Sequence, residues 1–477
     1  MSGKGKSRWA DSEEDAASEA KARKEKEEKK RLKREKAEAA RRAEEANKWQ
    51  AAASTATATA ERDDDHQDGR PAKRRRLTPE RSSEQGKGEG SKSGGPLLLR
   101  FQAGGGFGGS NSVEKYDKLN DIEEGAYGWV ARAREMATGK VVALKRLKID
   151  PNDRNGLPVT GLREIQILKD CEHRNIVKLH EVVVGEDTSK IENIFLVLEF
   201  VEHDLKSILE DMPQPFLASE VKTLLLQLAG GVAYLHHHWI LHRDLKTSNL
   251  LLNNRGQLRI ADFGMARYVG DPPPRLTQLV VTLWYRAPEL LLGASSYGQA
   301  VDMWSVGCIF GELLTREPLL QGKNEVDELT RIFELCGIPT DDTWPGFRRL
   351  PNAKSLRLPP TGRGNNTTGS VIRARFPLLT AAGASLLNSL LSLDPARRPS
   401  AKEMLDHEYF RQDPRPKSEA MFPTFPSKAG QERRRRRNTP NAPGRGDAVG
   451  LGAIDFSGIF AGRDKEERGG GFSLRMV

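Results

Sequence analysis

The feature that most constrains this 477-residue chain is a polar run, HRDLKTSN, which begins at His242 and is followed by the triplet Asp262-Phe263-Gly264. Asp244 offers a carboxylate that can orient a hydroxyl group and accept its proton, and Lys246 can neutralise charge on a transferred phosphoryl group. Asn249 and the aspartate of the triplet supply hard oxygen ligands of the kind that Mg²⁺ prefers beside ATP phosphates. These residues in this order predict phosphoryl transfer from ATP to a hydroxyl.

Both strings resemble, residue for residue, the catalytic and magnesium-binding loops of protein kinases. The resemblance implies an α+β, bilobal protein-kinase fold over residues 116–410. Its small, β-rich N-lobe would span 116–200 and its large helical C-lobe 204–410. It also implies ATP and Mg²⁺ as cofactors, with Asn249 and Asp262 as the metal ligands and Asp244 and Lys246 among the catalytic residues.

A second group of residues suits the nucleotide. The segment from Ile122 to Val130 stands where a kinase places its glycine-rich loop between two strands. Gly125 and Gly128 would let backbone N–H groups approach phosphates, although Glu123 replaces the first glycine of that motif. The segment Glu199-Phe200-Val201 resembles the kinase hinge, whose backbone binds adenine. The resemblance implies nucleotide contacts from Ile122, Gly125, Gly128, Val130, Lys145, Glu199, Val201 and Asp204.

Lys145 ends the apolar run Val142-Ala143-Leu144, which matches the kinase motif whose lysine binds the α- and β-phosphates. A helix is predicted over Leu162–Cys171, and its Glu164 is the natural ion-pair partner of Lys145. That pair must form for activity. We therefore count both residues among the catalytic set.

Within the kinases, the segment Pro158 to Glu164 resembles the PITSLRE helix of the cyclin-dependent kinase 11 group, with Val159 for Ile and Gly161 for Ser. Further matches occur at Glu202–Ser207, Trp239–His242 and Val301–Ser305, and the likeness spans about 116–425. It implies a proline-directed serine/threonine kinase with an L-type cyclin partner. It also implies a nuclear location and links to transcription, pre-mRNA splicing and the cell cycle.

The same resemblance implies a regulatory set. Thr277 stands where cyclin-dependent kinases carry their activating threonine, and Arg163, Arg243 and Arg267 match the three arginines that bind its phosphate. A partner that seats the Glu164 helix would also complete this phosphate site, so we expect the isolated chain to be nearly inactive.

Two further regulatory or specificity elements follow from the family likeness. Val280 and Val281 match the +1 pocket that prefers proline after the target Ser or Thr. Tyr127 resembles the inhibitory tyrosine of the glycine loop, but Ala126 replaces the threonine beside it.

Two alternatives remain open. The chain could be a pseudokinase scaffold for nuclear RNA-processing partners, which only the departure at Glu123 favours, since every chemically required residue is present. It could also be the related PISSLRE-type cyclin-dependent kinase, against which Glu123-Glu124-Gly125 and Trp239-Ile240-Leu241 argue.

Charge and composition set the outer regions apart. Residues 1–95 carry a net +5 and residues 411–477 a net +6, whereas the remainder is near neutral. A nucleic-acid-binding core is therefore not expected, and the basic tails are left as candidate RNA-binding segments. We expect 1–111 and the Pro/Gly-rich 411–477 to be disordered, with one charged helix over 18–47. The basic runs 29–36 and 71–77 are typical of nuclear-import signals.

The remaining features are consistent with an intracellular chain. Three widely spaced cysteines suit a reducing compartment, and no apolar run reaches the length of a membrane span. The kinase resemblance also implies that Asp302 braces the backbone of the catalytic loop and that Glu289 and Arg398 form a buried ion pair in the C-lobe.

Overall fold

The computed structural model describes residues 110–125, 128–147, 158–185, 193–270, 276–277, 280–357, 369–426, 442–443 and 454–455. Tyr127, the helix expected over 18–47 and both proposed import signals lie outside these residues. Among the described helices, none combines the length and apolar character needed to cross a lipid bilayer.

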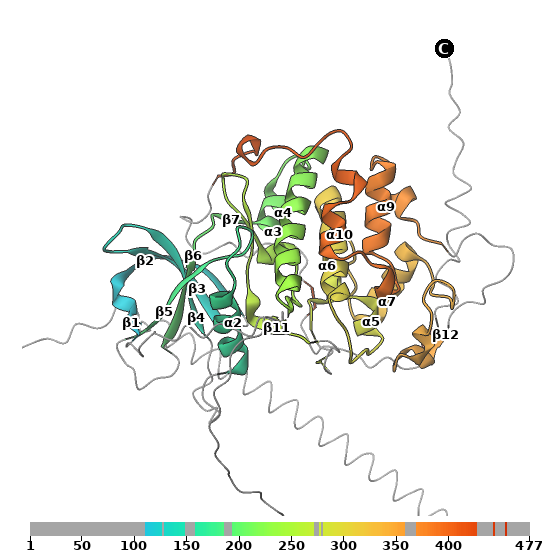
Figure 1. The fold of residues 1–477 in the computed structure, drawn as a ribbon, viewed down its shortest axis with the longest axis horizontal. Coiled ribbons are helices and arrows are strands. Elements are labelled where there is room, and N and C mark those ends of the chain that lie inside the picture. The colour runs from blue at the N-terminus through green and yellow to red at the C-terminus, as the bar shows by residue number, and fades with distance from the viewer. Residues whose placement is uncertain are drawn as a thin grey trace, which may run out of the picture. The chain divides into compact units, whose positions relative to one another are not determined.

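One six-stranded sheet forms the N-lobe, in the order β1-β5-β6-β4-β3-β2 (Figure 1). Its neighbours pair antiparallel except for the short parallel contact between β1 and β5. The strands are β1 (Asn111–Ser112), β2 (Tyr116–Gly125), β3 (Gly128–Glu135), β4 (Val141–Leu147), β5 (Leu179–Val184) and β6 (Ile194–Glu199). In β4, β-branched and aliphatic residues favour the extended backbone, and Val142 and Leu144 are buried.

The helix α2 (Val159–Asp170) of the N-lobe starts three residues earlier than the sequence predicts and ends one residue earlier. Pro158 precedes it, as suits a helix start because proline cannot donate a backbone hydrogen bond. Glu164, Ile167 and Leu168 share the face that is buried against the rest of the fold, which is the spacing of one helical face. Val159 and Leu162 remain about half exposed, at 57% and 48%.

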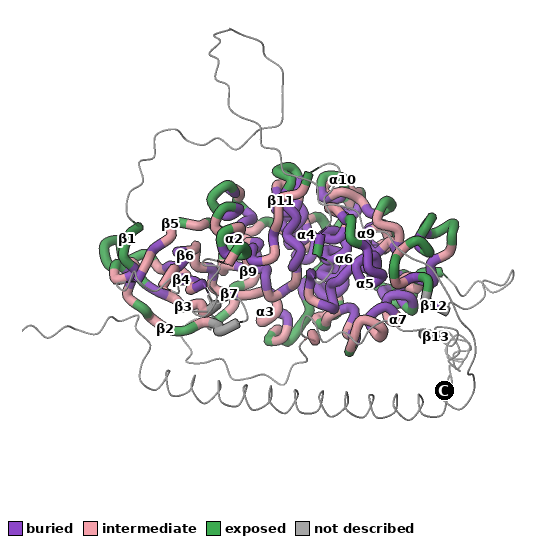
Figure 2. The backbone as a smooth tube through the Cα atoms, turned by 90° about the horizontal axis from the view of Figure 1, so that it is seen from below, coloured by how far each residue is buried: buried purple, intermediate pink, exposed green. Residues whose placement is uncertain are grey.

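The C-lobe is mainly helical, with α4 and α6 at its centre (Figure 1). Figure 2 shows that these two helices are buried along most of their length. The helices are α3 (Leu205–Asp211), α4 (Ala218–His237), α5 (Pro288–Leu291), α6 (Ala300–Thr315), α7 (Glu325–Cys336), α8 (Ile372–Arg375), α9 (Ala381–Leu390) and α10 (Ala401–Leu405). The predicted Glu289–Arg398 pair is confirmed, with two contacts of 2.7 Å between the guanidinium and the carboxylate.

Short strands lie where the two lobes meet. The strands β7 (His203–Asp204), β9 (Leu250–Leu252) and β10 (Leu258–Ile260) form one small sheet, and β8 (Ile240–Leu241) pairs with β11 (Arg267–Tyr268). Away from the other lobe, at the far end of the C-lobe (Figure 1), a parallel pair joins β12 (Leu356–Arg357) to β13 (Ile454–Asp455). The polar run 242–249 lies between β8 and the β9–β10 hairpin in the chain.

The ordered C-lobe extends past residue 410, where the sequence places the start of a disordered tail. Residues 411–426 run along the lobe, and Phe422 is only 7% exposed. Lys417 forms an ion pair of 2.8 Å with Glu220 of α4. This Pro-rich segment has no helical or strand periodicity, because isolated aromatics and backbone carbonyls make its contacts, so its order was not evident from the sequence.

Candidate active site

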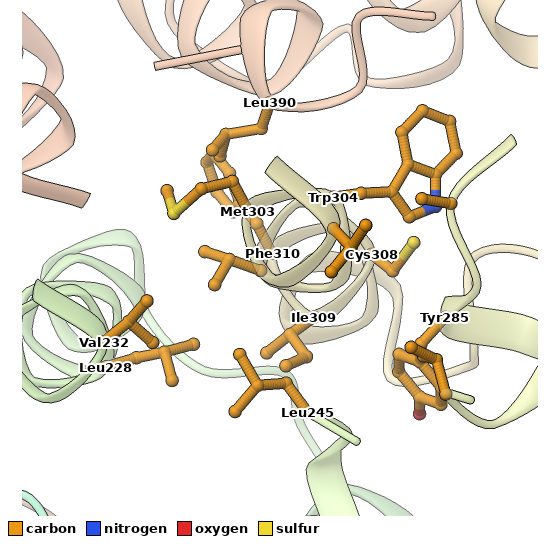
Figure 3. Close-up of a cluster of buried hydrophobic side chains, with 14 of the residues drawn as sticks. Leu228, Val232, Leu245, Tyr285, Met303, Trp304, Cys308, Ile309, Phe310 and Leu390 are labelled. Atoms are coloured by element: carbon orange, nitrogen blue, oxygen red, sulfur yellow. The ribbon is translucent and has the colours of Figure 1, made fainter. Parts of the chain in front are cut away.

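The catalytic loop is held from below by α6. The Asp302 carboxylate accepts hydrogen bonds from the backbone N–H groups of His242 (3.0 Å) and Arg243 (2.9 Å), which confirms the predicted brace. Leu245 is fully buried, and Figure 3 shows its side chain pointing toward Ile309 and the α4 residue Leu228. One apolar anchor and one carboxylate thus fix the loop that carries the reactive residues.

Asp244 is the centre of the loop and is 1% exposed. Its Oδ1 accepts hydrogen bonds from the backbone N–H (3.1 Å) and hydroxyl (2.8 Å) of Thr282. Lys246 Nζ lies 3.1 Å from Asp244 Oδ2 and 3.2 Å from the Thr282 hydroxyl. The structure therefore brings the two predicted catalytic residues together and adds Thr282, which the sequence analysis did not identify. In the sequence, only the position of Thr282 directly after Val280-Val281 indicated that it could lie near the substrate.

The Lys145 ammonium sits between two carboxylates. It lies 2.6 Å from Glu164 Oε1 on α2 and 3.0 Å from Asp262 Oδ1. Burial opposes protonation of Lys145, but the two carboxylates outweigh it and raise the pKa of this ammonium above its usual value. The expected ion pair is thus formed, and the structure shows α2 in its seated position.

Asn249 and Asp262 fit a hard divalent cation. The Asn249 Nδ2 donates to the Asp244 carbonyl at 2.8 Å, so the side-chain oxygen is the atom that remains to bind a metal. Burial opposes ionisation of Asp262, but the charge of Lys145 outweighs it and lowers the pKa of the carboxyl. Asp262 adopts a left-handed backbone (φ 63°), which is uncommon for residues other than glycine, and such conformations cluster at functional sites.

A protein kinase domain model matches residues 116–410, well over half of the chain. The chain belongs to the protein kinase family. Its predicted bilobal kinase fold is thereby confirmed, and kinases of this family use ATP with a divalent metal ion.

Curated relatives place it among the serine/threonine kinases. It is 55% identical over 322 residues to serine/threonine-protein kinase ppk23 of Schizosaccharomyces pombe, covering 68% of this chain and 79% of that protein. It is 52% identical to cyclin-dependent kinase G-2 of Oryza sativa subsp. japonica, over 69% of this chain and 46% of the relative. It is 51% identical to human cyclin-dependent kinase 11B, over 70% and 41% respectively. The match thus spans less than half the length of the rice and human proteins.

The nucleotide-side residues of this kinase lie on adjoining strands. In the β2–β3 hairpin Gly125 faces Gly128, and Val130 faces Lys145 on β4. Ile122 is half-buried on β2, upstream of the glycines. The strands therefore align these residues of the predicted nucleotide set beside Lys145.

The remaining members of that set follow β6. Glu199 ends β6, and its carboxylate lies 3.1 Å from Arg259 Nε. Val201 is 9% exposed, and Asp204 caps α3 by accepting a hydrogen bond from Ser207 N–H at 2.8 Å. These contacts hold the segment between the lobes at both ends.

One of the three predicted phosphate-binding arginines, Arg243, is linked to Thr277. Burial and the charges of Arg267 and Arg243 lower the pKa of Arg163, so the three cations act on one another. The Thr277 carbonyl accepts a hydrogen bond of 2.6 Å from Tyr297, whose hydroxyl in turn lies 3.2 Å from Arg243 NH1. The exposed Thr277 is therefore linked through Tyr297 to Arg243.

The +1 pair is fully buried, and Val281 has an unusual left-handed backbone (φ 64°). Arg286 donates to the Val280 carbonyl at 3.0 Å and to the Val281 carbonyl at 3.2 Å. Both carbonyls are therefore engaged within the protein.

A buried network beneath the loop also escaped the sequence analysis. Glu312 of α6 accepts hydrogen bonds from Thr247 (2.8 Å) and Tyr285 (2.7 Å). Thr247 belongs to the catalytic loop and Tyr285 follows the +1 pair, so one carboxyl joins both. The three residues are far apart in sequence, and no motif signalled their contact.

Glu312 makes stability depend on pH. Burial raises the pKa of its carboxyl from the usual 4.5 to about 7. Between these values the folded chain binds more protons than the unfolded chain, so the free energy of unfolding falls as pH rises. Between pH 4.5 and 7, the free energy of unfolding of Glu312→Gln should fall by up to about 3 kcal/mol less than that of the wild type. Urea unfolding at several pH values measures it, and the exposed Glu317→Gln should leave the decline unchanged.

Proposed function

We propose that this chain is a cyclin-dependent, proline-directed serine/threonine kinase that uses Mg²⁺. The observation that carries the proposal is the convergence of Lys145, Glu164 and Asp262 beside the loop that holds Asp244 and Asn249. A substrate hydroxyl would be oriented by Asp244, which accepts its proton as the oxygen attacks the γ-phosphorus. Lys246 would neutralise the charge that develops on the phosphoryl group.

Lys145 is proposed to hold the α- and β-phosphates, with Glu164 fixing its position. Asn249 and Asp262 would hold Mg²⁺, which neutralises charge on the phosphates when bound. The pKa of Asp262 lies below its usual value, so its carboxylate stays ionised and ready to bind a cation at neutral pH.

Preference for proline follows from the backbone of the +1 pair. The residue after the target Ser or Thr would bury its backbone N–H against the +1 pair, and a buried N–H needs an acceptor. The Val280 and Val281 carbonyls could serve as acceptors, but they already accept hydrogen bonds from Arg286. Proline has no N–H to satisfy. We infer that Ser-Pro and Thr-Pro sites are favoured because they leave no donor unpaired.

Dependence on a cyclin is supported by α2. Its inner face is buried, whereas Val159 and Leu162 remain exposed, so a partner could cover the outer face and hold Glu164 against Lys145. The charge of Arg243, which is linked to Thr277 through Tyr297, acts on the neighbouring Arg163. A cyclin on α2 and a phosphate on Thr277 would then stabilise the same helix position. The family likeness favours an L-type cyclin.

Transfer to matched peptides tests this proposal. We expect the full chain co-expressed with an L-type cyclin to phosphorylate a Ser-Pro peptide at least about ten times faster than the chain alone, and a Ser-Ala peptide far more slowly. Equal rates without cyclin would contradict cyclin dependence, and equal rates on both peptides would contradict the +1 argument. No transfer with cyclin bound would favour a scaffold.

The family likeness also supports a nuclear location and a role in transcription, pre-mRNA splicing and the cell cycle. The basic run 71–77 would serve import. A fluorescent fusion of the full chain that stays outside the nucleus would contradict the proposed location.

A further inference from the structure

Residues 411–426, called the strap below, run from the end of the helical core back over α4 toward β7 (Figure 1). The first half is fixed to α4. Lys222, whose side chain is fully buried, donates to the carbonyls of Gln412 (2.7 Å) and Pro414 (2.8 Å). The Thr223 hydroxyl donates to the Lys417 carbonyl at 2.7 Å.

The second half of the strap holds the tip of the β9–β10 hairpin. Asn254 exchanges two hydrogen bonds with the backbone of Phe425, accepting from its N–H at 2.8 Å and donating to its carbonyl at 3.1 Å. Gly256 has a positive φ of 75°, and a Cβ there would lie 2.5 Å from the Glu419 carbonyl oxygen. The hairpin tip and the strap are therefore packed backbone against backbone.

The other end of this hairpin carries both proposed metal ligands. Asn249 directly precedes β9, and Asp262 follows β10 after one residue. Ala261 N–H donates to the Asn249 carbonyl at 2.9 Å, so the hairpin sets the spacing of the two ligands. The antiparallel pairing of β9 with β10 runs from Leu252 and Leu258 near the tip to Leu250 and Ile260 at the open end, so a shift of the tip is carried to the two ligands.

The strap touches two further elements of the nucleotide site. The Phe425 ring packs edge-on against His203, with ring centres 5.9 Å apart, and His203 directly precedes Asp204 in β7. Glu419 forms an ion pair of 2.5 Å with Arg174, in the loop after α2. The next residue, Asn175, donates to the Leu258 carbonyl of β10 at 2.9 Å. One segment thus contacts the metal-ligand hairpin, the segment between the lobes and the loop after α2.

We propose that the strap positions Asn249 and Asp262 for the metal–nucleotide complex, with Asn254 and Phe425 as the positioning residues. The inference rests on the proposed function, because it takes these two residues as the metal ligands. Neither Asn254 nor Phe425 is placed against the reacting atoms. Their loss should therefore weaken binding of the metal–nucleotide complex and raise KM for ATP, while kcat at saturating ATP changes less than about twofold.

The test uses the full chain with its co-expressed cyclin and titrates the ATP analogue AMP-PNP by calorimetry at several Mg²⁺ concentrations. We expect Asn254→Ala and Phe425→Ala to weaken binding about five- to tenfold and to raise the Mg²⁺ concentration at half-saturation. Asn254→Asp keeps the acceptor for Phe425 N–H and should recover part of the loss. Leu387→Ala, in the core of α9 and far from the strap in sequence, is the control for general destabilisation.

Unchanged AMP-PNP affinity in Asn254→Ala would overturn the inference, and so would an equal loss in Leu387→Ala. If Phe425→Ala does not fold, the two Asn254 variants decide. Weaker AMP-PNP binding in Asn254→Ala that Asn254→Asp partly restores supports the inference, and equal losses in both contradict it. A wild-type chain that neither binds AMP-PNP with Mg²⁺ nor transfers phosphate would overturn the proposed function instead.

Discussion

Asp244→Asn is expected to lower kcat about 10³-fold, the size of effect typical for loss of a general base. The amide cannot accept the proton of the attacking hydroxyl, but its oxygen can still accept from the Thr282 N–H and hydroxyl, as Oδ1 does now. Lys145 and Asp262 are untouched, so nucleotide affinity should stay within about twofold. Single-turnover transfer to a Ser-Pro peptide and AMP-PNP titration measure the two quantities.

The exposed Asp341→Asn serves as the matched control, because it makes the same chemical change far from the loop in sequence. It should leave both quantities unchanged. A fall in kcat of less than about tenfold in Asp244→Asn would show that another group takes the proton, and the role assigned to Asp244 would then be wrong.

Asp302→Ala is expected to cost about 3–5 kcal/mol of folding free energy, the range seen when one partner of a buried polar cluster is removed. The change leaves the backbone N–H groups of His242 and Arg243 without their acceptor, and His236 loses its contact of 3.0 Å with the same carboxylate. Urea unfolding of the full chain measures the loss.

Asp302→Asn keeps one acceptor oxygen and should lose only part of that stability. The exposed Asp342→Ala should lose almost none. Equal stabilities of Asp302→Ala and the wild type would mean that water satisfies the loop backbone, and the brace would then contribute little.

The site could be predicted where its residues form short strings in the sequence. Asp244, Lys246 and Asn249 lie within one loop that matches a kinase motif. The prediction for Asp302 came from the same family likeness, through the match at Val301–Ser305. The pairing of Lys145 with Glu164 was predictable only through the kinase motifs on either side of it, because a lysine after an apolar strand is by itself more often a surface residue.

Contacts that join distant segments were not predictable in the same way. Thr247, Tyr285 and Glu312 meet under the loop, yet each is unremarkable in its own stretch. Their hydrogen bonds depend on how α6 packs beneath the loop, which periodicity does not encode. The start of α2 was missed because Gly161 and the β-branched Val159 have weak helix propensity, whereas the packing of Glu164, Ile167 and Leu168 decides the outcome.

The left-handed backbone of Val281 has a consequence for how this kinase would choose its targets. If proline is favoured because it lacks a backbone N–H, then the +1 pocket disfavours substrates that would bury an unpaired N–H there. It makes no attractive contact that is specific to the proline ring. Ser-Pro and Thr-Pro pairs are common in unstructured protein segments, so such a rule alone admits a very large pool of candidates. Discrimination within that pool would then have to come from contacts made elsewhere, by a bound partner or by parts of this chain remote from the reacting atoms.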